Sequence, residues 1–109
     1  MFNDCENLKE IKGLNNLITN KVTNMTTMFQ NCINLVSIDL SNFKTDNVTD
    51  MSYMFYGCGN LKEINLNNFK LNEKCEVDGL FDLNSLSYNP FSKKNCKVYA
   101  KDKNILNLF

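Results

Sequence analysis

The chain has 109 residues and no net charge, with 12 lysines balanced by 12 acidic residues. This length holds one domain with one core, and neutrality gives no reason to expect nucleic acid as a partner. No apolar run approaches the roughly eighteen residues of a membrane span, so a membrane contact would need an anchor outside this chain. The chain has no histidine, which is the commonest general base and metal ligand. We therefore expect a protein that is not an enzyme and that binds no cofactor or metal.

A repeat with a period of about 26 residues organises the chain from its start to about residue 86. The stretch NLVSIDLSNF at 34–43 recurs as NLKEINLNNF at 60–69, and VTNMTTMF at 22–29 recurs as VTDMSYMF at 48–55. We divide the repeat region into units of about 1–27, 28–53 and 54–86. Cys5 aligns with Cys32 at a shift that is one longer than the period, so the first unit carries one extra residue, which we place near Gly13.

The first unit opens in mid-repeat, because MFxxC at 1–5 stands where MFxxC stands at 28–32. We therefore expect a fragment of a longer protein. Its uncapped N-terminal edge would expose an unpaired strand and part of a core, which favours self-association.

Each unit has two halves with different periods. Ile38 and Leu40 alternate with polar residues, which predicts a short strand with one buried face. Val48, Met51 and Cys58 belong to a series with steps of three and four, which predicts one or two helical turns. Asparagine and aspartate between the halves supply turn chemistry. A unit is thus predicted as strand, turn, short helix and return.

The repeated motifs resemble a known family. The pattern LxxIxL at 35–40 resembles the leucine-rich repeat consensus, with Phe43 in place of the usual asparagine, and LSNF at 40–43 with VTDMSYMFYGC at 48–58 is similar to BspA-type repeats. These repeats occur in bacterial surface proteins and mycoplasma lipoproteins, and the bias toward asparagine and lysine fits a mycoplasma or similar low-GC bacterium.

This resemblance implies an α/β repeat fold, a short right-handed leucine-rich-repeat-like solenoid with parallel strands on one face and short helices on the other. NCKVYAKD at 95–102 is similar to the closing strand and helix of such arrays, so residues 87–109 are expected to form a loop, a closing strand and a cap. The family implies display at the cell surface, a role in adhesion or partner binding, and no catalytic residues.

The outward side of the strands is the candidate binding face. Repeat proteins commonly bind along such a face, and we expect a host or neighbouring macromolecule, a protein, as the partner. Glu10 and Lys12 would flank the face in the first unit, and the nearest exposed aromatic residues are Tyr53 and Tyr56 on the helical side. The alternative is a structural spacer in a larger surface protein, with no ligand. If Ile38 and Leu40 point inward, the face consists of Ser37, Asp39, Ser41, Glu63, Asn65 and Asn67.

The cysteines follow the repeat more closely than they follow a metal-site pattern. Zinc sites usually contain close pairs such as CxxC, whereas Cys5, Cys32 and Cys58 recur at the spacing of the repeat, one in each unit. We expect these three to form a column of small buried side chains. Cys75 and Cys96 lie outside that column, and the sequence leaves open whether they form a disulfide or remain free thiols.

Other polar residues receive a structural interpretation. Asparagines at matched positions, such as Asn34 and Asn60, are expected to satisfy backbone groups between units. Asp39, Asp46 and Asp50 lack the spaced oxygen ligands of a calcium loop, so no calcium site is predicted.

Overall fold

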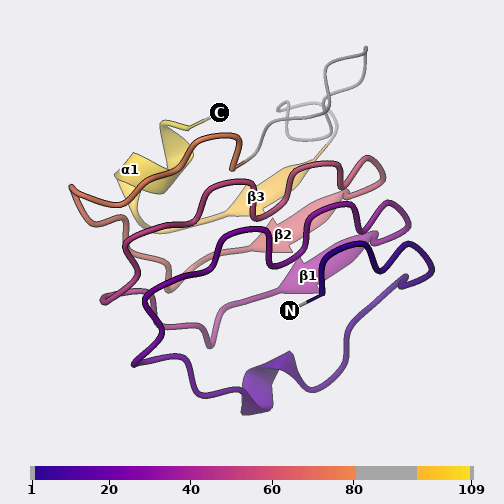
Figure 1. Ribbon diagram of the computed structural model, residues 1–109, viewed down its shortest axis with the longest axis horizontal. Helices are drawn as coiled ribbons and strands as arrows, with labels where there is room; N and C mark the ends of the chain where they lie inside the picture. The colour runs from indigo at the N-terminus through magenta and orange to yellow at the C-terminus, as the bar shows by residue number, and fades with distance from the viewer. Residues whose placement is uncertain (1, 81–95, 109) are drawn as a thin grey trace.

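Three short strands form a parallel sheet. The computed structural model describes residues 2–80 and 96–108. The sheet has the order β1-β2-β3 and is parallel throughout, so an α/β class with a small parallel sheet and few helices is confirmed. In chain order, the elements are the 3-10 helix η1 (Leu14–Asn16), the strands β1 (Ser37–Asp39), β2 (Glu63–Asn65) and β3 (Lys97–Tyr99), and the helix α1 (Lys103–Leu106) (Figure 1).

Strands β1 and β2 pair residues that are equivalent in the sequence repeat. Ile38 pairs with Ile64, one repeat period later, and Ile64 pairs with Val98 after a longer step along the chain. On the opposite side of the fold, isolated parallel bridges join Asn24 to Asp50 and Asp50 to Glu76, and each again spans one period. Parallel neighbours need a crossover between them, and each unit supplies that crossover by running across the fold and back.

The segment opposite the sheet is a series of tight turns, so the helical turns predicted at 48–58 are wrong. Tyr53 and Gly57 have φ values of 58° and 80°, a left-handed conformation that interrupts an α-helix. The amides of Met54, Tyr56 and Cys58 each bond the carbonyl of the third residue before them. The steps of three and four in the sequence arise because each tight turn returns an apolar side chain to the core.

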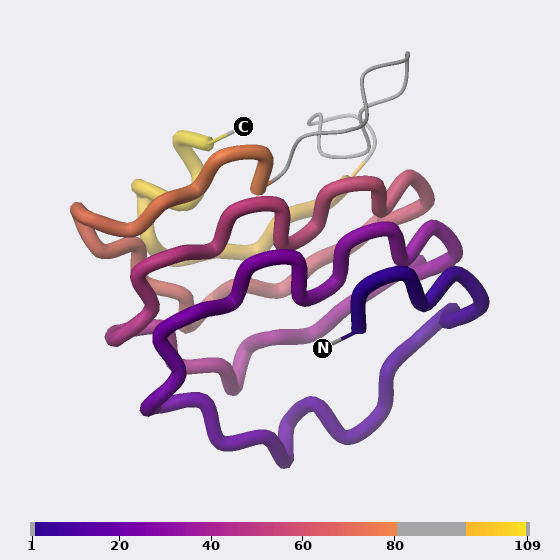
Figure 2. The backbone as a smooth tube through the Cα atoms, viewed as in Figure 1, coloured from indigo at the N-terminus to yellow at the C-terminus, as the bar shows by residue number. Residues whose placement is uncertain are grey.

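Alternate amides of these turns bond the next unit instead of their own. Such bonds cannot form within a helix, whose amides are used internally, and they explain why successive units run side by side in Figure 2. The bonds run from Met51 to the carbonyl of Glu76, from Tyr53 to that of Asp78 and from Phe55 to that of Leu80, at 2.8, 2.9 and 3.2 Å.

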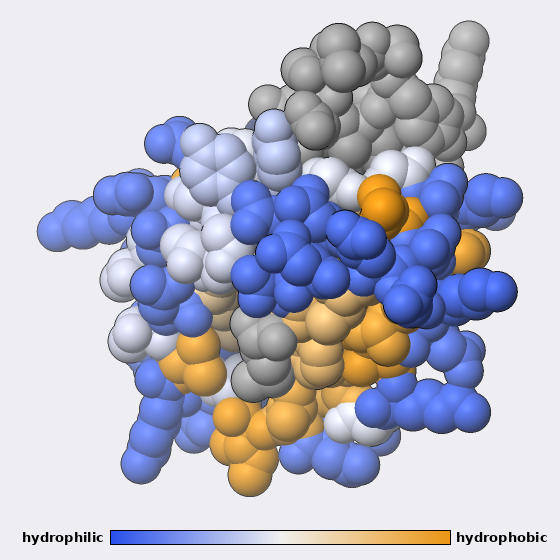
Figure 3. All heavy atoms as spheres, turned by 45° about the vertical axis from the view of Figure 1, so that its right-hand side comes forward, coloured by the Kyte–Doolittle hydropathy of each residue, from blue (hydrophilic) through white to orange (hydrophobic). Residues whose placement is uncertain are grey.

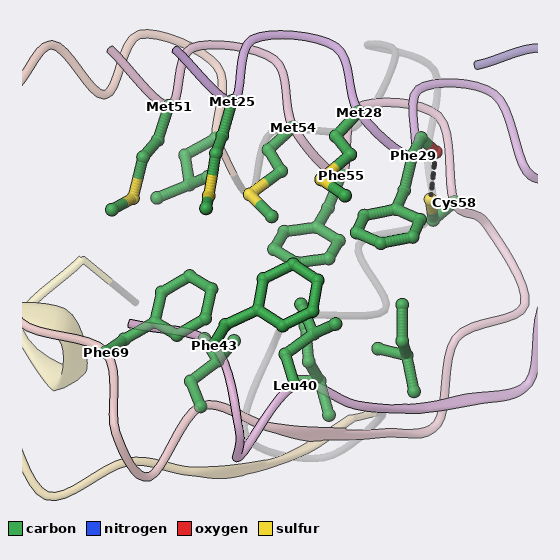
Figure 4. Close-up of a cluster of buried hydrophobic side chains, with 14 of the residues drawn as sticks. Met25, Met28, Phe29, Leu40, Phe43, Met51, Met54, Phe55, Cys58 and Phe69 are labelled. Carbon is green, nitrogen blue, oxygen red and sulfur yellow. Dashed lines mark hydrogen bonds between the residues drawn. The ribbon is translucent and has the colours of Figure 1, made fainter. Parts of the chain in front are cut away.

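Aromatic rings fill the space between the turns and the sheet in two stacked columns. The rings of Phe2 and Phe29 have centroids 5.5 Å apart, and those of Phe29 and Phe55 are 5.6 Å apart, with interplanar angles of 4° and 3°. Phe43 and Phe69 stack at 6.5 Å. Equivalent side chains of successive units therefore lie over one another, and parallel-displaced rings attract each other beyond their buried area. Figure 4 shows four methionine side chains pointing from the turns into the core: Met25, Met28, Met51 and Met54.

Buried threonines join one unit to the next. The Thr45 hydroxyl is fully buried; it donates to the Lys70 carbonyl at 3.0 Å and accepts from the Lys70 amide at 2.9 Å. Thr19 makes the same two bonds to Lys44, at 3.1 and 2.8 Å. In the described part of the chain, no buried side-chain nitrogen or oxygen lacks a hydrogen-bond partner. The polar groups between units are therefore fully paired, as buried polar groups must be if they are not to destabilise the fold.

Matched asparagines also bridge the units, as predicted. The Asn34 amide donates to the Glu6 carbonyl at 2.6 Å, and the Asn60 amide donates to the Ile33 carbonyl at 2.8 Å. The separation of these two acceptors in the sequence exceeds the repeat period by one. Further along the units, Asn42 and Asn68 donate to the carbonyls of Asn15 and Ser41, acceptors that are one period apart. The extra residue of the first unit thus lies between Glu6 and Asn15, a stretch that includes Gly13.

The first unit adds no strand to the sheet. Residues 10–12, the predicted position, have no strand partner, and one bond, from the Val36 amide to the Lys9 carbonyl at 3.3 Å, joins this stretch to the segment before β1. The extra residue explains the difference, because Gly13 takes a φ of 84° and starts η1 in place of a continued strand. Glu10 and Lys12 pair with each other at 3.5 Å, both largely exposed.

The predicted closing strand and helix are β3 and α1. Asp102 caps α1, accepting the Asn104 amide at 2.9 Å through Oδ1 and the Leu71 amide at 2.8 Å through Oδ2. One carboxylate therefore both starts the helix and fixes it to the repeat region. The predicted loop around Pro90 and the end of the third predicted unit lie outside the described residues.

Candidate binding face

The predicted face lies along β1 and β2 and the turns that follow them. Ile38 is buried, and its neighbours Ser37 and Asp39 are exposed, as the alternation predicts. The register places Ser37 beside Glu63 and Asp39 beside Asn65. Ser41 and Asn67 are half-buried and follow the strands. The sheet therefore brings the four strand residues together in two rows, and the two turn residues continue from their ends.

Two of these side chains hold the backbone of the turns. Asp39 Oδ1 accepts the Ser41 amide at 2.9 Å, and Asn65 Oδ1 accepts the Asn67 amide at 3.0 Å. Hydrogen bonds from the hydroxyl and the amide of Ser41 lower the pKa of the Asp39 carboxyl below its usual value of 3.8. Part of the hydrogen-bonding capacity of this face is thus used within the fold, a role that belongs to aspartate and asparagine in turns.

β3 extends the face by two residues that the sequence prediction omitted. Lys97 pairs with Glu63, and Tyr99 pairs with Asn65. Tyr99 is 43% exposed, so the face does contain an aromatic side chain, contrary to the prediction. The sequence signal was the alternation in KVY at 97–99, but the step from β2 to β3 is longer than the repeat period, and the repeat alone could not align it.

The face carries both signs of charge at close quarters. Across the sheet, one row consists of Ser37, Glu63 and Lys97, and the next consists of Asp39, Asn65 and Tyr99. The first row therefore runs from a small residue on β1 to a basic residue on β3, and the second row runs from an acidic residue on β1 to an aromatic residue on β3. Such a surface offers hydrogen-bond donors and acceptors with one large apolar contact, but it does not select for a highly charged partner.

Tyr53 and Tyr56 lie on the turn side, away from this face. Their rings are 5.5 Å apart at 79°, an edge-to-face pair, and Tyr53 is 43% exposed. A Cβ on Gly79 would lie 2.5 Å from the Tyr53 ring, so the ring occupies space that only glycine leaves open. The pair is therefore a fixed feature of the opposite surface.

The cysteines at the repeat spacing serve the packing between units. Cys32 and Cys58 are buried, and each thiol donates to a phenylalanine carbonyl of the preceding unit, that of Phe2 or Phe29, at 3.0 Å. Burial raises the pKa of Cys58 from 9.0 to about 12 and raises the pKa of Cys32 above 9.0. Cys5, at the open end of the column, is only half-buried.

Cys75 and Cys96 are both free thiols in this structure, so the disulfide alternative is not adopted. Burial raises the pKa of Cys96 to about 11 and also raises the pKa of Cys75. Within residues 2–80 and 96–108, no group of three or more histidine, cysteine, aspartate or glutamate side chains could hold a metal ion. In the same residues, no helix has the length and apolarity needed to cross a bilayer.

Comparison with family models connects this arrangement to a described group of sequences. Residues 1–107 match the model for a mycoplasma protein of unknown function, DUF285. The chain belongs to the DUF285 family. Membership agrees with the mycoplasma origin suggested by the lysine and asparagine bias, and DUF285 carries no described activity that could be transferred to the chain. No curated protein and no solved structure gave a significant match.

Proposed function

We propose that the chain is a short right-handed leucine-rich-repeat-like solenoid of the BspA type, a non-enzymatic module displayed at the cell surface. Its strand face would bind a host or neighbouring protein. The fold part of this proposal is supported by the register between β1 and β2, which is offset by one repeat period, and by the matching bridges from Asn24 to Asp50 and Glu76. Residues one period apart meet on both sides of the core, as the stacking of successive solenoid units requires.

The observation that supports binding most directly is the three-strand face itself. Tyr99, Lys97 and Glu63 present an aromatic ring, a cation and a carboxylate on neighbouring strands. Aromatic side chains that are rigid and partly exposed are common anchors of protein interfaces, and β3 holds Tyr99 beside a polar rim. A partner with complementary polar groups and an apolar contact for Tyr99 fits this surface.

The second candidate is a structural spacer, a segment of a larger surface protein with no ligand of its own. It is favoured by the use of Asp39 and Asn65 to hold the backbone of their turns. In a spacer, the polar residues of the face would serve only solubility and turn geometry.

A binding assay with two matched triple variants separates the candidates. The immobilised chain is exposed to a panel of purified extracellular-matrix and plasma proteins, and binding is followed by surface plasmon resonance. The face variant combines Ser37→Ala, Glu63→Ala and Tyr99→Ala, which leave the turn-holding residues intact.

The control variant combines Thr23→Ala, Tyr53→Asn and Glu76→Ala on exposed positions elsewhere; asparagine tolerates the left-handed conformation of residue 53. Binding that the face variant loses and the control variant keeps supports the proposed face. Equal binding by both variants removes this face from the proposal, and an absence of binding to the whole panel favours the spacer.

A further inference from the structure

One row of the strand face places an acidic and an aromatic side chain on either side of a short amide. This row, which we call the Tyr99 row, consists of Asp39, Asn65 and Tyr99. Neighbouring strands lie about 4.8 Å apart, so the Cα atoms of Asp39 and Tyr99 lie roughly 10 Å apart. Asn65 is half-buried, and its side chain turns along the chain to accept the Asn67 amide. The Tyr99 row therefore has a low middle between the carboxylate on β1 and the ring on β3.

The exposed carboxylate of Asp39 has no cationic partner in the part of the chain that the structure describes. Lys12, which the repeat aligns with Asp39, pairs with Glu10 instead. Lys97 lies beside Glu63 in the sheet, so these two opposite charges offset each other at the edge of the face. The bond from Asp39 to its own turn uses only part of the carboxylate, which accepts up to about four hydrogen bonds. One negative charge with free acceptor positions therefore remains at the β1 end of the row.

The ring of Tyr99 is an exposed aromatic surface on a fixed backbone. The residue is 43% exposed, and its carbonyl accepts the Leu66 amide at 2.6 Å within the sheet. In Figure 3 apolar residues gather on the lower half of the molecule, the level at which Figure 1 places the first unit, below β3. Tyr99 thus lies outside that apolar area, among the polar residues of the strand face.

A planar cation matches both ends of the Tyr99 row. The face of an aromatic ring attracts a cation within about 6 Å of its centroid, and a carboxylate accepts cationic N–H groups at about 2.8 Å. A guanidinium can span the row because its plane stacks on a ring while its edge donates to a carboxylate. An ammonium group is compact and more strongly hydrated, and an apolar group would leave Asp39 without a partner.

We propose that the Tyr99 row receives one arginine side chain of the partner, with the guanidinium over Asn65, stacked on Tyr99 and bonded to Asp39. The row belongs to the face that we propose for binding, so its occupant rests on that proposed function. Because Glu63 and Lys97 offset each other beside the row, the partner needs a single cation here and not a strongly basic surface.

An NMR titration of the isotope-labelled full chain tests this occupant directly. The probes are three blocked tripeptides that carry arginine, citrulline or lysine between two glycines. Citrulline has the shape of arginine without its charge, and lysine has the charge without the planar group. The arginine peptide should shift the amide signals of Asp39, Asn65 and Tyr99 together and in a saturable way. The lysine peptide should bind at least about twofold more weakly, and the citrulline peptide should give no saturable shift. Low ionic strength is needed because salt screens exposed charges.

Two matched aspartate variants separate the row from the net charge of the chain. Asp39→Asn introduces the residue that the next unit has at the equivalent position, where Asn65 holds the same turn, so the fold should persist. Asp50→Asn is the control on the turn side. Asp50 Oδ1 accepts the Ser52 amide at 2.9 Å, and Asn24 makes the equivalent bond in the unit before. Each variant removes one negative charge, but only Asp39→Asn should weaken binding of the arginine peptide, by roughly two- to fivefold.

Tyr99→Leu tests the other end of the row. Leucine keeps an apolar side chain without an aromatic face, so this variant should weaken the arginine peptide by a similar factor, roughly two- to fivefold. Unchanged binding by Tyr99→Leu overturns the proposal. So does an arginine peptide that shifts the signals of the row no more than the citrulline or lysine peptide. Equal weakening by Asp39→Asn and Asp50→Asn also overturns it, because binding would then follow net charge alone.

The peptide titration and the protein panel fail in different ways. If the arginine peptide does not bind while the strand face still binds a purified protein, the arginine assignment is wrong and the proposed function stands. If the arginine peptide binds as expected and the face binds no purified protein, the Tyr99 row is a site for a guanidinium and the proposed protein partner is wrong.

Discussion

The threonine bonds between units allow a quantitative test of how much one unit depends on the next. Thr45 is fully buried, and its hydroxyl bonds both the carbonyl and the amide of Lys70. Thr45→Val keeps the shape of the side chain and removes only the hydroxyl. The amide and carbonyl of Lys70 then face a methyl group in place of the hydroxyl that they bond in the wild type.

The expected loss follows from the two groups left unpaired. A buried backbone group without a partner costs about 1–3 kcal/mol, so Thr45→Val should lower the free energy of unfolding by roughly 2–4 kcal/mol after partial relaxation. Thr45→Ser keeps the hydroxyl and loses one methyl group, at about 1 kcal/mol. The order of stability should therefore be wild type, serine variant, valine variant.

Thr49→Val is the matched control. Thr49 is exposed, and its hydroxyl donates at 3.2 Å to the Thr23 carbonyl, which also accepts the Thr49 amide at 2.8 Å. That carbonyl remains paired when the hydroxyl is removed, so the loss should stay within about 0.5 kcal/mol.

Urea unfolding followed by circular dichroism measures all four proteins at one protein concentration, since a dimer would make stability depend on concentration. Equal m-values would show that only stability has changed. If Thr45→Val and Thr49→Val differ by less than about 1 kcal/mol, the Thr45 hydroxyl does not hold the units together and the reasoning is wrong.

Two further predictions concern the turn side. Gly57→Ala should destabilise the protein by about 1–3 kcal/mol, because Gly57 has a φ of 80° and a Cβ there would collide with the Asn31 side chain. Gly59→Ala is the control and should be near neutral, because a Cβ on Gly59 would have nothing within 4 Å. Urea unfolding measures both variants, and similar losses of stability in the two would contradict this prediction. Burial raises the pKa of Cys58 from 9.0 to about 12, so the folded state keeps a proton that the unfolded state releases, and this thiol makes the free energy of unfolding fall as pH rises from about 9 toward 12. Cys58→Ala should make the alkaline decline shallower in unfolding experiments run across that range, with the remainder due to Cys32, Cys75 and Cys96, whose pKa values burial also raises. An unchanged slope would assign the decline to these other groups.

Much of the fold could be predicted from the sequence because the spacing of the repeat fixes which residues become neighbours. Ile38 beside Ile64 follows from the repeat together with the alternation of buried and exposed residues that defines a strand. The contact of the Cys58 thiol with the preceding unit could also be predicted, because the cysteines recur at the spacing of the repeat. These are properties of spacing, and spacing is fully visible in a sequence.

The errors arose where two structures share one spacing or where the spacing changes. Consecutive tight turns place apolar residues three and four apart, as a helix does, and the distinguishing feature was backbone conformation at Asn31 and Gly57, residue types that favour left-handed φ. The first unit, which carries the extra residue, has Gly13 in a left-handed conformation and η1 in place of the predicted strand. The longer step to β3 hid Lys97 and Tyr99 from the candidate face.

The bonds between units also bear on how such a chain can change its length. Thr19 and Thr45 make the same pair of bonds, to Lys44 and Lys70 respectively, at the same separation along the chain. A tandem duplication of one whole unit within the gene would therefore keep this threonine bond at each new junction, and a deletion of one whole unit would restore it between the units that become neighbours. An insertion of any other length would break that correspondence, as the single extra residue before η1 already does on a small scale.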